Sequence, residues 1–377
     1  MKIVLTGGGS GGHFYPLIAV AEEINDIVDH RHLVKPEIYY MSNTVEEEML
    51  LYQNDIQYKH IQAGKIRKYF SLQNGTDFFK TLIGLPQAIH QLFRVYPDVV
   101  FSKGGYASVP IVFAARILRI PVFVHDSDAI PGRANLWAGK FAKRISVSYP
   151  EAAEHFKDPK KVAFVGNPVR KELRMPQTRN AHEYFQLVPD IPTIVILGGS
   201  QGADYINHTI LRALPELLDK YQIIHQVGKN NFEGHKELIN IELHEHPHIS
   251  RYRVFPTLTP LELRTAAGAA DLIISRAGSG AIFELACWEK PSILVPIPED
   301  VSRDQRRNAY AYARTGATEV IEQHNFTPHV VAAEIERVIN DPALCQKMKE
   351  GAKEFAQPEA AHKIAEELIE MMLEHEK

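Results

Sequence analysis

The stretch LTGGGSGGHFYP, residues 5–16, places five glycines, a serine and a histidine between a short apolar run and a helical pattern. The apolar run is typical of a buried strand, and Ile18, Ala21, Ile24 and Val28 recur at the spacing of one helix face. Glycine lets backbone amides approach a ligand closely, and the N-terminus of a following helix favours negative charge. The stretch therefore predicts the first strand–loop–helix unit of a doubly wound domain, with a site for phosphate or diphosphate.

The second half of the chain repeats this layout in residues 193–218, TIVILGGSQGADYINHTILRALPELL. Its helical part carries Ile206, Ile210, Leu214 and Leu217 on one face. In both halves, apolar β-branched runs alternate with helical stretches, which favours parallel sheets. A chain of 377 residues is also long enough for two domains. We therefore expect an α/β protein with two doubly wound, Rossmann-like domains.

Composition and charge exclude several classes of protein. The net charge of -4 gives no reason to expect nucleic-acid binding. The two cysteines, Cys287 and Cys345, have no metal-ligand spacing and form no disulfide framework, which fits a reducing cytosol. The most apolar stretch, residues 109–124, is interrupted by two arginines and two prolines, and no signal peptide precedes the first glycines. We expect a cytosolic protein that is at most peripheral on a membrane.

The unusual residues gather where the expected strands end. SKGGYASVP (102–110), HDSDAIPG (125–132) and GNPVR (166–170) follow strands of the first half. GGSQGA (198–203), SRAGSGAIFE (275–284) and PEDVSRDQRRNA (298–309) follow strands of the second half. In open α/β sheets, ligands bind beyond the carboxyl ends of the strands. We therefore expect one central cleft between two facing sheets.

The sequence lacks the residues that two common phosphate-binding sites require. A nicotinamide site needs an acidic residue near the tip of the second strand, where this chain has Met41, Ser42 and Asn43. Neither glycine loop contains the Gly-Lys-Ser/Thr of a P-loop. Residues 279–282 instead offer amides to a phosphate, and Glu284 offers a carboxylate to two ribose hydroxyls. The ligand is therefore expected to be a nucleotide bound in the second domain.

Six of these motifs (GGGSGGHFYP, SKGGYASVP, GNPVR, GGSQGA, SRAGSGAIFE and DQRRNA) occur in the order and spacing of the MurG family, which the chain resembles over nearly its whole length. That family transfers N-acetylglucosamine from UDP-N-acetylglucosamine to the 4-hydroxyl of the N-acetylmuramyl group of lipid I, giving lipid II in peptidoglycan synthesis. The resemblance implies the GT-B architecture. It also implies residues 1–168 as an acceptor-binding, membrane-facing domain, 169–356 as the UDP-sugar domain, and 357–377 as a helix returning to the first domain. The implied partners are UDP-N-acetylglucosamine, an undecaprenyl-pyrophosphoryl-linked acceptor and the inner leaflet of the cytoplasmic membrane, with no required cofactor and no nucleic acid.

The resemblance also implies roles for individual residues. His13 is the expected catalytic base, because histidine titrates near neutral pH, and Asp128 is the rival base. The first loop is expected near the acceptor's diphosphate, and three of its residues are also counted with the donor site. The donor-binding set is Gly9, Ser10, Gly11, Asp128, Arg170, Ser200, Gln201, Ser279, Gly280, Ala281, Glu284, Asp304, Gln305 and Asn308. The acceptor-binding set is Gly8, Gly12, Gly104, Gly105 and Tyr106.

Three departures from the family pattern bear on the sugar contacts. The family usually reads HEQN where this chain has residues 125–128, HDSD, so its asparagine is replaced by Asp128. An ionised aspartate accepts hydrogen bonds and donates none. The usual threonine of the phosphate loop is Ala281, and the usual His or Gln before Gln305 is Asp304. Asp126 and Asp128 also resemble an Asp-x-Asp cation site, so a divalent cation is possible without being implied.

A segment with mixed basic and aromatic residues, 64–86, suits a lipid surface. Basic side chains attract an anionic leaflet, and aromatic side chains settle at its interface. The residues expected to face the membrane are Ile66, Arg67, Lys68, Phe70, Phe78, Phe79 and Lys80.

Three alternative functions stay open at this point. A related GT-B enzyme could use another lipid acceptor, such as diacylglycerol. A UDP-N-acetylglucosamine 2-epimerase shares the fold and needs no membrane-facing segment. An inactive nucleotide-sugar-binding module would agree with the three departures.

Overall fold

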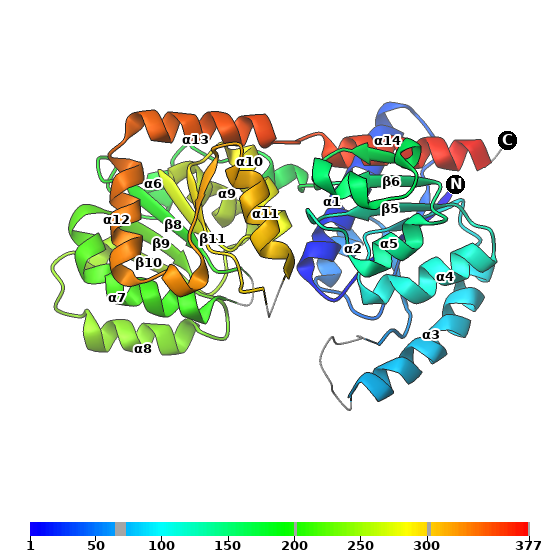
Figure 1. Ribbon diagram of the computed structural model, residues 1–377, viewed down its shortest axis with the longest axis horizontal. Coiled ribbons are helices and arrows are strands. Elements are labelled where there is room, and N and C mark those ends of the chain that lie inside the picture. Colours follow the sequence, from blue (N-terminus) through cyan, green and yellow to red (C-terminus); the bar gives the residue numbers. More distant parts are fainter. Residues whose placement is uncertain (65–72, 200–201, 300–302, 376–377) are drawn as a thin grey trace. The chain divides into compact units, whose positions relative to one another are not determined.

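The computed structural model describes residues 1–64, 73–199, 202–299 and 303–375 (Figure 1). The chain forms two compact units, one made of Met1–Lys171 with Gln357–Lys377 and the other of Glu172–Ala356. We call them unit 1 and unit 2. Among the residues described, no helix combines the length and the apolar character needed to cross a membrane.

In the described part of unit 1, seven parallel strands form one sheet in the order β3-β2-β1-β4-β5-β6-β7. The strands are β1 (Lys2–Thr6), β2 (Glu37–Ser42), β3 (Ile56–His60), β4 (Val99–Ser102), β5 (Val122–Asp126), β6 (Arg144–Val147) and β7 (Val162–Phe164). The central strand β1 pairs with β2 on one side and β4 on the other, with Val4 opposite both Tyr39 and Val100. The strand order reverses between β1 and β4, so the loops that follow these two strands meet at a topological switch point.

The helices of unit 1 cover this sheet. They are α1 (Gly11–His30), α2 (Glu48–Gln53), α3 (Gln73–Val95), α4 (Val109–Ile117), α5 (Arg133–Gly139) and α14 (Ala360–His375). The helix face predicted for α1 is buried, as expected from its apolar spacing. The same core contains Ile364, Leu368 and Met372 of α14, so the last helix of the chain completes the core of the first unit.

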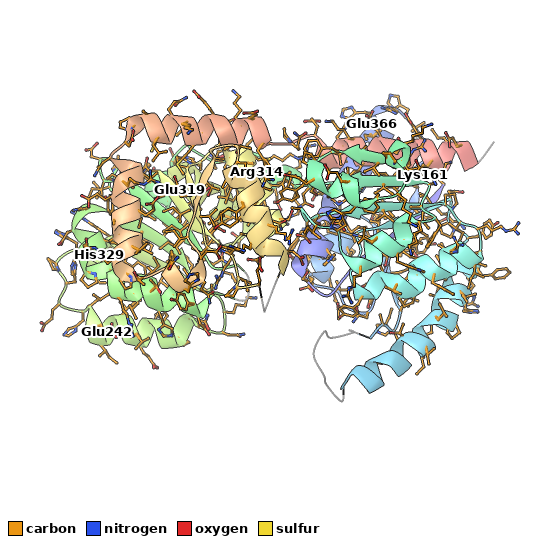
Figure 2. All side chains as sticks on the ribbon, viewed as in Figure 1. Lys161, Glu242, Arg314, Glu319, His329 and Glu366 are labelled. Atoms are coloured by element: carbon orange, nitrogen blue, oxygen red, sulfur yellow. The ribbon has the colours of Figure 1, made fainter. Side chains whose placement is uncertain are left out.

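Charged side chains also tie α14 to unit 1. His362 Nδ1 lies 3.0 Å from a carboxylate oxygen of the buried Glu23 of α1. Glu366, labelled in Figure 2, pairs with Arg31 at the end of α1. The red helix α14 and the blue helix α1 can be followed side by side in Figure 1. Because the exposed pairs contribute little free energy, the apolar contacts supply most of the stabilisation.

In what the structure describes of unit 2, six parallel strands form a sheet in the order β10-β9-β8-β11-β12-β13. The strands are β8 (Thr193–Leu197), β9 (Gln222–Gln226), β10 (Tyr252–Phe255), β11 (Leu272–Ser275), β12 (Ser292–Leu294) and β13 (Thr318–Val320). The strand order reverses between β8 and β11, so this sheet has a switch point of the same kind.

The helices of unit 2 are α6 (Ala181–Tyr184), α7 (Asp204–Lys220), α8 (Phe232–Glu242), α9 (Pro260–Ala269), α10 (Ser279–Trp288), α11 (Arg303–Ala313), α12 (Pro328–Ile339) and α13 (Pro342–Phe355). The predicted apolar face of α7 is buried, from Ile206 through Leu217. Helix α9 begins with a capping box in which Thr259 and Glu262 satisfy each other's backbone amides. The prediction of two doubly wound α/β domains is confirmed.

Short 3₁₀ turns join several elements, at Tyr106–Ser108, Pro150–His155, Pro159–Lys161, Lys171–Leu173, Ile249–Arg251 and Gln323–Asn325. The chain passes from unit 1 to unit 2 within the fourth of these turns, between residues 171 and 172. The boundary expected from the sequence was after residue 168.

Candidate functional site

Two glycine loops meet at the switch point of unit 1. Gly9, Gly104 and Gly105 have φ values of +93°, +85° and +78°, which favour glycine over residues with a side chain. A Cβ on Gly105 would lie 2.7 Å from the carbonyl oxygen of Gly8, so the two loops are in contact. A Cβ on Gly9 would lie 2.5 Å from a ring carbon of Tyr106. The structure therefore brings most of the predicted acceptor-binding residues together.

His13 lies in the first turn of α1, directly after the first glycine loop. Its Nδ1 is hydrogen-bonded to Ser10 Oγ at 3.0 Å. Its Nε2 faces the second loop, since a Cβ on Gly105 would lie 3.4 Å from it. Burial, and then the positive charge of Lys103, lower the pKa of His13 from 6.5 to about 4. The imidazole is therefore neutral at neutral pH and able to accept a proton.

Asp128 lies on the loop after β5, and Asp126 holds that loop in place. The carboxylate of Asp126 accepts hydrogen bonds from the backbone N of Asp128 at 3.0 Å, the backbone N of Gly132 at 3.0 Å and Asn135 Nδ2 at 2.7 Å. Burial raises the pKa of Asp126. Within the described ranges there is no group of three or more His, Cys, Asp or Glu side chains that could hold a metal ion.

Lys103 is a residue at this site to which the sequence analysis assigned no role. It is buried, 1% exposed, and its Nζ lies 2.6 Å from His125 Nδ1 and 2.8 Å from Asn167 Oδ1. Its Nζ also donates to Ser127 Oγ. Burial lowers the pKa of Lys103 to about 7, although the charges of Asp126 and Asp128 act in the opposite direction. In the sequence, Lys103 directly precedes two glycines at the end of a strand. A lysine in that position is equally compatible with a solvent-exposed side chain.

Arg170 lies in unit 1, although the resemblance placed it in the donor set. It is 9% exposed, and its guanidinium carbon lies 4.9 Å from the ring centroid of Tyr15 on α1. The neighbouring Lys171 Nζ is paired with Asp26 of the same helix at 2.6 Å. The structure thus groups Arg170 with the helix that carries His13, while the residues of the phosphate loop belong to unit 2.

The N-terminus of α10 lies at the switch point of unit 2. A Cβ built on Gly278 or Gly280 would have no described heavy atom within 4 Å beyond the adjacent residues and the helix backbone, so there is room beside these two positions. The first amides of a helix have no intrahelical acceptor, and together with the helix dipole they form an anion site. Ser279 is buried, and Ala281 and Glu284 are half-buried on the first turns. This arrangement suits a diphosphate with a ribose one turn further along.

The loop after β8 reaches the same switch point. Gly199 and Gly202 have φ values of +81° and +80°. Gln226 Nε2 donates to the carbonyl oxygen of Gly199 at 3.0 Å, which joins the ends of β8 and β9. The predicted donor residues Ser200 and Gln201 lie outside the described residues.

Helix α11 carries the remaining predicted donor residues, Asp304, Gln305 and Asn308, in its first two turns. Gln305 Oε1 accepts a hydrogen bond from the backbone N of Ile297 at 3.2 Å, and Asn308 is 1% exposed. Helices α10 and α11 are in contact. Arg276, to which the sequence analysis gave no role, donates from Nη1 to the carbonyl oxygen of Val295 at 3.1 Å and so links the ends of β11 and β12.

Part of the predicted membrane-facing set cannot be placed. Ile66, Arg67, Lys68 and Phe70 lie outside the described residues, as do the side chains of Phe78 and Phe79. Lys80 on α3 is exposed. Large apolar side chains are also exposed nearby, on α3 and on α4, which packs against it: Leu82, Ile83, Phe113 and Ile117.

Comparisons with known proteins agree with this arrangement. Residues 3–147 match the glycosyltransferase family 28 N-terminal domain, and residues 193–365 match the C-terminal domain of the same family. A Bacillus thuringiensis subsp. konkukian protein named UDP-N-acetylglucosamine–N-acetylmuramyl-(pentapeptide) pyrophosphoryl-undecaprenol N-acetylglucosamine transferase 2 is 37% identical over 371 residues, 98% of this chain and 99% of the relative. The crystal structure of Acinetobacter baumannii MurG matches with a TM-score of 0.74 and 25% identity, over 98% of this chain and 99% of that one.

A more distant neighbour shares the fold alone. The UDP-GlcNAc 2-epimerase from Neisseria meningitidis, bound to UDP-GlcNAc, matches with a TM-score of 0.68 and 15% identity, over 98% of this chain and the whole of that one. Two doubly wound domains, each with a glycine loop at its switch point, form the GT-B architecture, and the two matching family models place the chain among the glycosyltransferases of this architecture. Within that class, the chain belongs to glycosyltransferase family 28, in which it is a member of the MurG family.

Proposed function

We propose that this enzyme transfers N-acetylglucosamine, with inversion, from UDP-N-acetylglucosamine to the 4-hydroxyl of the N-acetylmuramyl group of lipid I, giving lipid II in peptidoglycan synthesis. The observation that carries the proposal is the 37% identity, over 98% of the chain, to a transferase whose name states this donor and this acceptor. The glycine loops at both switch points support it, because each can offer amides to a diphosphate.

The donor binds unit 2 in this proposal. The amides at the start of α10 bind the diphosphate and stabilise the negative charge that develops on UDP as it departs. Glu284, one turn along α10, accepts hydrogen bonds from the two ribose hydroxyls. Gln305 and Asn308 on α11 bind sugar hydroxyls, and Asp304 and Ala281 rearrange those contacts relative to the usual family pattern. Ser279 and Gly280 complete the phosphate loop.

The acceptor binds unit 1, with its diphosphate at the loops of Gly8 and Gly105. His13 Nε2 then takes the proton from the attacking hydroxyl, while Ser10 orients the imidazole through Nδ1. A neutral imidazole is required for this step, and the lowered pKa of His13 supplies it. Asp128, whose loop is held by Asp126, binds the transferred sugar and is the alternative base.

The acceptor's undecaprenyl chain requires contact with a membrane, and we place that contact on unit 1. The exposed Leu82 and Ile83 of α3, which closely follow the exposed Lys80, and the exposed apolar side chains of α4 can settle at a lipid interface. This supports peripheral association with the cytoplasmic face of the cell membrane.

Turnover with a lipid I analogue tests the proposal. UDP release and formation of the disaccharide product, both dependent on UDP-N-acetylglucosamine, are the expected result. Transfer to diacylglycerol instead would identify a related enzyme with another acceptor. Conversion of the donor sugar to its C2 epimer with no acceptor present, with or without UDP release, would identify an epimerase. Donor binding with neither UDP release nor epimerisation in these assays would leave only an inactive sugar-nucleotide-binding module.

A further inference from the structure

A buried ammonium group lies beneath the acceptor-side loops, and the proposed reaction gives it no direct part. Lys103 directly follows β4, where its backbone N donates to the carbonyl oxygen of Thr6 at 2.8 Å. It therefore belongs to the switch point itself and directly precedes Gly104. A Cβ on Gly7 would lie 3.0 Å from Lys103 Cβ, so the lysine stem packs against the first glycine loop.

The ammonium group donates hydrogen bonds to residues at the ends of two other strands. His125 Nε2 lies 2.9 Å from the carbonyl oxygen of Gly166, which is only an acceptor, so Nε2 carries the imidazole hydrogen. His125 Nδ1 therefore accepts a hydrogen bond from Lys103 Nζ. The other two acceptors are Ser127 Oγ on the loop after β5 and Asn167 Oδ1 on the loop after β7. One side chain thus connects three loops that are far apart in sequence.

We propose that Lys103 is a positioning residue for glycosyl transfer, whose ammonium group holds the loop bearing Asp128 and the loop bearing Asn167 against the glycine loops beside His13. The expected effect of Lys103 on turnover rests on the proposed function. The three hydrogens of its ammonium group are used by His125, Ser127 and Asn167, so Lys103 acts through these loops.

Two of the acceptors of this ammonium group are themselves buried. His125 and Asn167 are 0% and 1% exposed, so their acceptor atoms are shielded from bulk water and Lys103 is their donor. A buried acceptor without a donor is unfavourable, and the loops would move to recover hydrogen bonds. Ser127 would move with them, and it directly precedes Asp128 in the chain.

Charge gives Lys103 a second effect on the same site. The titratable groups around it are His125 and Asp126 of β5, Asp128 of the following loop and His13 of α1. Its positive charge contributes to the lowered pKa of His13, after burial. Removing that charge therefore makes the imidazole easier to protonate.

The test compares Lys103→Met, which keeps the length of the side chain and removes its donors, with wild type and Lys290→Met. Lys290 serves as the control, because it is a partly buried lysine whose Nζ also donates to a protein acceptor, the carbonyl oxygen of Ala270, at 2.7 Å. It lies two residues before β12, at the amino ends of the unit 2 strands, whereas the glycine loops follow the carboxyl ends. Amide hydrogen exchange at Asp128 and Gly132 reports loop order without requiring turnover.

We expect Lys103→Met to raise exchange at both amides by about tenfold or more. We also expect kcat to fall by roughly tenfold to a thousandfold while KM for UDP-N-acetylglucosamine changes less, because the diphosphate and ribose of the donor bind unit 2. The acid limb of kcat/KM should move to higher pH, and Lys290→Met should change none of these. Lys103→Arg, which restores the charge and donors, should recover part of kcat.

Unchanged amide exchange and unchanged kcat in Lys103→Met would overturn the proposal. An equally large increase in exchange and decrease in kcat in Lys290→Met would overturn it as well. Absence of turnover in the wild type would refute the proposed function, while the exchange comparison would still decide the positioning role. If Lys103→Met does not fold, Ser127→Ala removes one of the three contacts. Faster exchange at Asp128 in that variant supports the proposal, and unchanged exchange contradicts it.

Discussion

The pH dependence of turnover gives a direct test of His13 as the base. In the protein without substrates, burial and the charge of Lys103 lower the pKa of His13 from 6.5 to about 4. This difference corresponds to about 3 kcal/mol between the charged and neutral imidazole. The neutral form therefore predominates over the charged form by roughly a thousandfold at neutral pH. Because kcat/KM reports groups of the unliganded enzyme, its acid limb should lie well below pH 6.5.

Binding of the acceptor should raise the pKa of His13. A diphosphate at Gly8 and Gly105 places negative charge near the imidazole and favours its protonated form, which raises the pKa of His13. The acid limb of kcat, which reports the complex, should therefore lie at least about one pH unit above that of kcat/KM. A base with a higher pKa also accepts the proton of the attacking hydroxyl more readily.

The assay is UDP release with a water-soluble acceptor analogue, measured over a range of pH at saturating and at low acceptor concentration. His13→Ala should lower kcat by roughly a hundredfold to ten-thousandfold and should abolish the acid limb. Because the folded protein binds the proton of His13 less tightly than the unfolded chain, the free energy of unfolding should fall as the pH decreases from 6.5 to about 4. Retention of both kcat and the acid limb in His13→Ala would refute the assignment.

Three further predictions concern the donor, the sugar and the membrane. Glu284→Ala should weaken UDP-N-acetylglucosamine binding by about 1.5–3 kcal/mol in calorimetry, because two ribose hydroxyls lose their acceptor, and unchanged affinity would remove Glu284 from the site. Asp128→Asn restores the family's usual residue and should retain turnover. Loss of turnover in this variant would favour the Asp128 carboxylate as the base. Leu82→Glu with Ile83→Glu should reduce binding to anionic vesicles and turnover of the lipid-linked acceptor together, while turnover of a soluble analogue is kept. The exposed Ile241 of unit 2 provides the control, Ile241→Glu, and equal loss with both acceptors would contradict the membrane role of α3.

Much of the fold could be predicted because its signals are local. The apolar runs KIVLT and TIVIL coincide with β1 and β8, and the glycines after them lie at the two switch points. Strand β3 was missed, because its sequence IQYKH has a single strongly apolar aliphatic residue and only Ile56 is buried. Strand β13 was missed because its sequence TEV has a single aliphatic residue and an acidic one before it.

Parts of the site could not be predicted because they depend on contacts between distant residues. Lys103 is buried only because residues 125, 127 and 167 supply its acceptors, and nothing adjacent in the sequence indicates this. The packing of Arg170 on Tyr15 likewise joins residues from opposite ends of the first unit. Motif spacing located the loops correctly, but the roles of these two side chains depend on the folded arrangement.

The return of α14 to unit 1 has a consequence for synthesis of the chain. Unit 2 is continuous in sequence, so it can fold as soon as its residues have left the ribosome. The core of unit 1 lacks Ile364, Leu368 and Met372 until the last helix emerges, although its strands are made first. The helix that carries His13 is therefore covered by α14 only after both units' other elements have been made. The protein's two halves should mature in the reverse of their order in the gene, and a ribosome that stops before residue 360 would release a chain with an intact second unit and an incompletely packed first one.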